Sequence, residues 1–85
     1  MLLQELKDRL KLEGFDRLKC YSFSSEQPPI EGYILEEANS GWSVLYFERG
    51  QTRRIAWFYV ESYACDWPYK KLHDEYGSVS GRNLN

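Results

Sequence analysis

The stretch VLYFERGQTRRIAWFY, residues 44–59, constrains the fold more than any other part of this chain. Aromatic and large aliphatic residues run on both sides of an Arg49-Gly50 pair, and residues of these types favour strands. Glycine supplies the positive φ that a tight hairpin turn requires. The stretch therefore predicts two antiparallel strands, residues 42–48 and 52–60. The charged segment between them is interpreted as a hairpin turn rather than as a catalytic or nucleic-acid-binding site.

A two-residue turn also predicts which side chains share a face of this hairpin, because side chains alternate along a strand. Pairing Glu48 with Gln51 places Trp42 opposite Trp57. One face then carries Trp42, Val44, Tyr46, Arg53, Ile55, Trp57 and Tyr59, and the other carries Leu45, Phe47, Ala56, Phe58 and Val60.

Both faces of the predicted hairpin are apolar, yet the chain has only enough helix to cover one of them. Leu, Phe and Val have no polar group, whereas Trp and Tyr tolerate partial exposure through their N–H and O–H groups. We therefore expect Leu45, Phe47, Phe58 and Val60 to be core. The face with Trp42, Tyr46, Trp57 and Tyr59 is then left open for binding.

Helical periodicity is present at both ends of the chain. Leu2, Leu3, Leu6 and Leu10 predict an amphipathic helix of about three turns, which Gly14 ends. A second helix is expected at residues 61–76, before Gly77. Pro68 must either kink that helix or lie in its first turn with Asp66 as the N-cap.

The chain between the first helix and the hairpin predicts two more strands. Residues 18–23 alternate and are β-rich, and residues 30–37 form a second strand-like run after the break at SSEQPP. Short connections between successive strands favour an antiparallel meander. The predicted fold class is α+β: one small domain, residues 1–76, with a four-stranded antiparallel sheet and the N- and C-terminal helices on one face. Residues 77–85 are expected to form a flexible tail.

The charge is unevenly distributed. The net charge is −2, but residues 18–48 contain five glutamates against one lysine, and three arginines follow within residues 49–60 without an acid. This balance argues against general nucleic-acid affinity, which needs a broad positive field. No apolar run is long enough to span a membrane. The N-terminus lacks the features of a signal peptide, so we expect a cytoplasmic protein with Cys20 and Cys65 unpaired and buried.

No motif in the chain predicts catalysis or metal binding. His73 is the only histidine and lies eight residues after Cys65, too far along one helix for a hydrogen bond; a pairing with Cys20 stays open. The adjacent acids of residues 36–37 and 74–75 point in different directions and cannot converge. No zinc-type spacing and no glycine-rich phosphate loop is present. We therefore expect neither an enzyme nor a cofactor or metal site.

Several short motifs point to a family. The strand ending in ERG, the segment FYVESYAC, and the earlier YSF and GY resemble the small α+β immunity proteins of bacterial polymorphic-toxin and contact-dependent growth inhibition systems. The resemblance covers residues 15–76. It implies a cytoplasmic protein that binds and neutralises the C-terminal effector domain, frequently a nuclease, of a cognate toxin encoded beside it. Toxin contacts vary within the family, so the resemblance assigns no binding residue.

The residues themselves suggest where such a toxin would bind. Acids oppose the basic cleft that a nuclease uses for its substrate, and exposed aromatic side chains act as anchors. The candidate toxin-binding residues are Glu31, Glu36, Glu37, Trp42, Tyr46, Trp57 and Tyr59. The alternative is a non-catalytic interaction module, a homodimeric adaptor that uses the same aromatic face.

Overall fold

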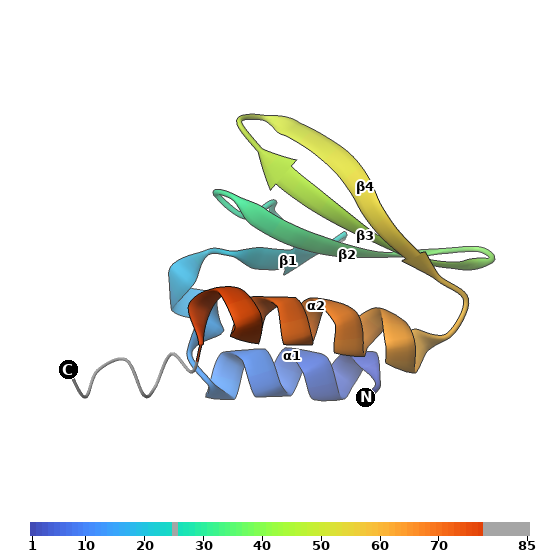
Figure 1. The fold of residues 1–85 in the computed structure, drawn as a ribbon, viewed down its shortest axis with the longest axis horizontal. Coiled ribbons are helices and arrows are strands. Elements are labelled where there is room, and N and C mark those ends of the chain that lie inside the picture. The colour runs from blue at the N-terminus through green and yellow to red at the C-terminus, as the bar shows by residue number, and fades with distance from the viewer. Residues whose placement is uncertain (25, 78–85) are drawn as a thin grey trace.

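The computed structural model describes residues 1–24 and 26–77, and in this part the chain forms two helices and one four-stranded sheet (Figure 1). The elements in chain order are α1 (Leu3–Leu12), the 3₁₀ turn η1 (Phe15–Leu18), β1 (Tyr21–Phe23), β2 (Gly32–Ala38), β3 (Gly41–Glu48), β4 (Gln51–Phe58) and α2 (Glu61–Tyr76). The two helices lie side by side beneath the sheet in Figure 1. The predicted tail, from residue 78 onward, lies outside the described residues.

The sheet is mixed, so the prediction of a fully antiparallel meander was wrong. Its strands follow the order β1-β2-β3-β4, and β2, β3 and β4 pair antiparallel, but β1 and β2 run parallel. The connection returns the chain to the starting end of β1, where Ile30 N donates to Lys19 O (3.2 Å) and Tyr33 N donates to Cys20 O (3.0 Å). Adjacent prolines in this connection cannot donate to a ladder, so it forms no hairpin.

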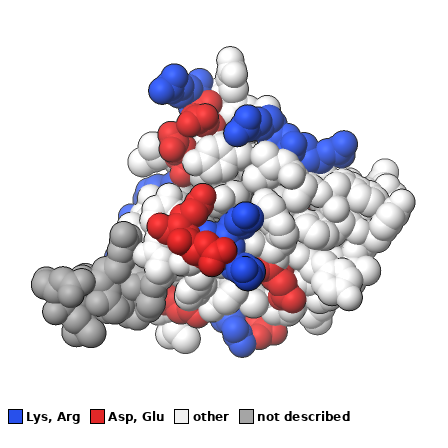
Figure 2. Space-filling view, viewed as in Figure 1, with Lys and Arg blue, Asp and Glu red and all other residues white. Residues whose placement is uncertain are grey.

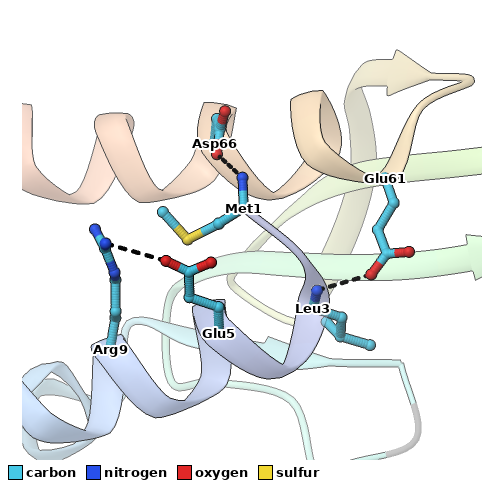
Figure 3. A network of polar contacts seen from close by, with 6 residues as sticks. All are labelled: Met1, Leu3, Glu5, Arg9, Glu61 and Asp66. Atoms are coloured by element: carbon cyan, nitrogen blue, oxygen red, sulfur yellow. Dashed lines mark hydrogen bonds and ion pairs between the residues drawn. The ribbon is translucent and has the colours of Figure 1, made fainter.

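Helix α1 begins and ends as the sequence predicts. Leu6 and Leu10 are buried, and Gly14 takes a left-handed conformation (φ 87°) directly after the last turn. The start of α1 is tied to α2 by polar contacts (Figure 3): the N-terminal ammonium lies 2.6 Å from Asp66 Oδ1, and Leu3 N donates to Glu61 Oε2 at 2.8 Å. These contacts set the first turn of α1 against the N-terminal half of α2.

Helix α2 accommodates Pro68 in its interior. The helix begins at Glu61 with Val60 as N-cap, so the alternative that puts Pro68 in a first turn capped by Asp66 was wrong. Proline has no N–H, and the carbonyl four residues earlier therefore has no helical donor. The ring is buried with Leu72 of α2 and with Leu6 and Leu10 of α1, so it contributes to the core between the helices and the sheet.

The β3–β4 turn confirms the predicted register at the tip. Arg49 (φ 54°) and Gly50 (φ 78°) both have positive φ, as in a type I′ hairpin turn, and Glu48 pairs with Gln51. Farther from the turn the register shifts by one residue between Val44 and Leu45. Ile55 is the extra residue of this β-bulge.

The bulge overturns the predicted assignment of faces on this hairpin. Beyond it, Val44 pairs with Ala56 and Trp42 with Phe58, instead of Ile55 and Trp57. Val44 and Trp42 are buried in the core under the helices, with only 8% of Trp42 exposed, whereas the sequence placed them on the open face. The side of the sheet that faces away from the helices carries Leu45, Phe47 and Trp57, which are half-buried and outside the core. Phe58 does pack against the core, as predicted, but Val60 is exposed.

Replacing Trp42 with alanine tests this corrected assignment. Because the indole is buried in the core, Trp42→Ala should lower the free energy of unfolding by about 3 to 5 kcal/mol. Tyr63→Ala, which truncates an aromatic side chain that is 63% exposed on α2, is the control and should cost clearly less. The measurement is urea unfolding of both variants and the parent. A Trp42→Ala protein as stable as the parent contradicts the assignment.

Candidate functional site

Two tyrosines of the central strands meet two glutamates where the sheet overlies the end of α2. The rings of Tyr33 and Tyr46 pack edge to face, with centroids 5.2 Å apart. The Tyr33 hydroxyl lies 2.8 and 2.9 Å from the two carboxylate oxygens of Glu75, and the Tyr46 hydroxyl donates to Glu31 at 3.4 Å. Each hydroxyl is therefore turned towards a carboxylate. We call Glu31, Tyr33, Tyr46, Glu48 and Glu75 the tyrosine–glutamate cluster.

Acids outnumber basic residues in and beside this cluster: three glutamates surround the tyrosines, and Arg53 is the cross-strand neighbour of Tyr46. Burial, first, and the negative charges of Glu31, Glu75 and Glu48 raise the pKa of Tyr46 above its ordinary value. Burial and the hydrogen bond to Glu75 also raise the pKa of Tyr33. Both hydroxyls thus stay protonated at neutral pH and donate to carboxylates, which orients the acids. Figure 2 shows acidic side chains near the hairpin and over the helices, with basic side chains along the upper edge and also beside the acids over the helices.

The other predicted site residues are not brought together. Glu37 and Trp42 pair across β2 and β3 on the helix side, and Trp42 is buried. Trp57 lies on the opposite side of the sheet and packs against Tyr59, with ring centroids 4.3 Å apart, and Tyr59 is 77% exposed. Of the seven predicted residues, Glu31 and Tyr46 share a hydrogen bond in the described structure, and the remainder are divided between the two faces.

The side of the sheet away from the helices forms a second candidate surface. Ile34, Leu45 and Arg54 lie in one cross-strand row, and Glu36, Ser43 and Trp57 lie in the next. We call Glu36, Leu45, Phe47, Arg54 and Trp57 the open sheet face; Ile34 and Ser43, on the same side, are already buried. Its central side chains are apolar, and one acid and one arginine flank them.

Sequence reasoning missed Tyr33 and Glu75, which are 42 positions apart and meet only through the fold. It also missed the polar contacts that join the end of α1 to the C-terminal half of α2. Glu13 accepts hydrogen bonds from the Tyr69 hydroxyl (2.6 Å) and from His73 Nε2 (2.7 Å). No local pattern marks contacts of this kind, because their partners lie on different elements.

The cysteines and the histidine do not form a nucleophilic pair in the described structure. Cys20 and Cys65 are free and buried, as expected, and the Cys20 thiol is directed at the Phe15 carbonyl (3.8 Å). His73 is engaged by Glu13. Within residues 1–24 and 26–77, no group of three or more ligating side chains is suited to a metal ion. No helix in the described part of the chain has the length and apolar character needed to cross a membrane.

Comparison of the chain with protein-family models, with curated proteins and with solved structures gives no match.

The two thiols predict how stability changes at alkaline pH. Burial raises the pKa of Cys20 and of Cys65 to about 11, from an ordinary value of 9.0. The unfolded chain therefore loses these protons first, and the stabilising effect of the neutral thiols, complete below pH 9, is lost as the pH rises towards 11.

The measurement is urea unfolding between about pH 8 and pH 11 for the parent and for Cys65→Ala, whose alkaline loss of stability should be smaller than the parent's. In parallel, a disulfide-exchange reagent at about pH 8 should react slowly with the folded protein. After unfolding without reductant, it should react with both thiols. Rapid reaction of the folded protein contradicts the buried, neutral state of the thiols.

Proposed function

We propose that this protein is an immunity protein that binds the C-terminal effector domain of a cognate bacterial toxin, a nuclease, and neutralises it. The observation that carries the proposal is the tyrosine–glutamate cluster, in which three carboxylates surround a pair of packed tyrosines. The resemblance to immunity proteins supports it independently. That resemblance covers residues 15–76, which include all five residues of the cluster.

A nuclease offers a fitting partner for this surface. Its cleft is positively charged because it binds phosphates, and a negative surface on the inhibitor speeds association and favours the correct orientation. The cluster supplies this charge locally, although the whole chain has a net charge of only −2. The hydrogen bond from the Tyr33 hydroxyl holds the Glu75 carboxylate in place, so less side-chain freedom is lost on binding.

The tyrosines supply the second component of such an interface. Tyr46 is half-buried, and its ring offers apolar area with a polar tip at the edge of the core. Aromatic side chains of this kind carry much of the binding energy in protein interfaces, while the surrounding acids contribute mainly to the association rate. The binding residues proposed here are therefore Tyr46 and Glu31, as the sequence suggested, together with Glu48 and Glu75. In this proposal the protein acts by occlusion, in the cytoplasm, and performs no catalysis.

The test is growth protection by this chain against the effector domain of the toxin encoded beside it, with binding kinetics for purified partners. Tyr46→Ala should weaken binding by about 2 kcal/mol, roughly 30-fold, mainly through faster dissociation. Glu31→Lys should mainly slow association and reduce its dependence on salt.

Asp8→Lys is the matched control, because it makes the same change of net charge at an exposed position of α1, where Asp8 accepts a hydrogen bond from the Gln4 side chain. It should protect like the parent. All three variants must first show the circular dichroism of the folded protein. If Tyr46→Ala and Glu31→Lys bind and protect as well as the control, the toxin does not bind at this cluster.

A further inference from the structure

We propose that two copies of this chain associate through the open sheet face, with the apolar side chains packed together and Glu36 of each copy paired with Arg54 of the other. This inference concerns the opposite side of the sheet from the tyrosine–glutamate cluster and does not depend on the proposed function.

The apolar centre of this face is the first observation. Both helices lie on the other side of the sheet, and Leu45, Phe47 and Trp57 are outside the core that the helices cover. A sheet face of this composition is normally covered by a second layer, and two such faces pack about 10 Å apart.

The charges that flank this centre are the second observation. Glu36 lies on β2 and Arg54 on β4, with β3 between them, so the two side chains sit on opposite sides of the apolar residues. Within the described residues, neither takes part in an ion pair or a side-chain hydrogen bond. The face therefore carries one unpaired charge of each sign, placed across an apolar strip.

This arrangement is complementary to itself. A two-fold axis that runs along β3 between two facing sheets exchanges the positions of β2 and β4. It therefore lays β2 of each copy over β4 of the other. Because Glu36 lies in the row of Trp57 and Arg54 in the next row, each Glu36 reaches Arg54 of the second copy diagonally, one row along the strand. The same contact forms twice, once on each side of the apolar centre. Among the occupants of an apolar face, a second copy is the one whose charges this geometry matches.

The dimer leaves the tyrosine–glutamate cluster uncovered, because that cluster lies on the helix side of β2 and β3. Two toxin domains can then bind to one dimer. Dimerisation and toxin binding are thus separate properties, and variants of one surface should leave the other unchanged.

The experiment is sedimentation equilibrium of the full chain, followed by charge reversal. The parent should sediment at twice the chain mass of 10.1 kDa. Glu36→Arg and Arg54→Glu should each weaken self-association at least about 10-fold, because each creates two like-charge contacts in the dimer. An equimolar mixture of these two variants should form a heterodimer, since each contact between positions 36 and 54 then joins one arginine to one glutamate.

Matched controls are the neighbouring residues on the same strands, Glu37→Arg and Arg53→Glu, whose side chains point to the other face of the sheet. These should remain dimeric. Circular dichroism verifies that each variant is folded. A parent that stays monomeric at high concentration overturns the dimer. Controls that dissociate as readily, or a mixture that stays monomeric, overturn the Glu36–Arg54 contact.

Failure of this inference is distinguishable from failure of the proposed function. Sedimentation requires no toxin, and toxin protection is measured with Glu31→Lys and Tyr46→Ala, which leave the open sheet face intact. If the parent is monomeric but still protects through the cluster, only the dimer proposal is contradicted. If the parent is dimeric but gives no protection, only the toxin-binding proposal is contradicted.

Discussion

The β-bulge in β4 is the constraint on which both surfaces of this protein depend. The tip of the β3–β4 hairpin sets one register, and the extra residue, Ile55, replaces it with another before the strands reach α2. Ala56 and Phe58 are thereby turned towards the helices, where the Phe58 ring lies 6.3 Å from that of Trp67. Trp57 is turned to the opposite side. Without the bulge, the small Ala56 and the large Trp57 would exchange faces, and the core would have to enclose an additional indole.

The parallel pairing of β1 and β2 has a similar consequence at the other end of the sheet. It brings the start of β2 against the start of β1, so closely that a Cβ atom on Gly32 would lie 1.9 Å from the Cys20 carbonyl oxygen. Gly32 also has a φ of 152°, which residues with side chains rarely adopt. This close approach fixes the position of Tyr33, the next residue, whose hydroxyl reaches Glu75 at the end of α2.

The two surfaces carry different arrangements of charge. The carboxylates of Glu31, Glu48 and Glu75 gather around Tyr46, with Arg53 as the cross-strand neighbour of Tyr46, whereas Glu36 and Arg54 lie on the opposite face. The net charge of −2 does not show this arrangement, because it sums the charges of both faces. Binding and steering respond to the local field, so one small domain can present both a negative surface and a self-complementary one.

The sequence by itself determined the elements that depend on neighbouring residues. The leucine spacing and Gly14 gave the extent of α1, residues 61–76 formed α2, Arg49-Gly50 formed the turn, and both cysteines are free. Tertiary structure alone decided the bulge, the parallel direction of β1, the burial of Trp42 and the contact of Tyr33 with Glu75. The physical reason is one of range. Periodicity and turn chemistry act over a few residues, whereas which face of a strand is buried depends on how well its side chains pack against helices that are distant in the chain.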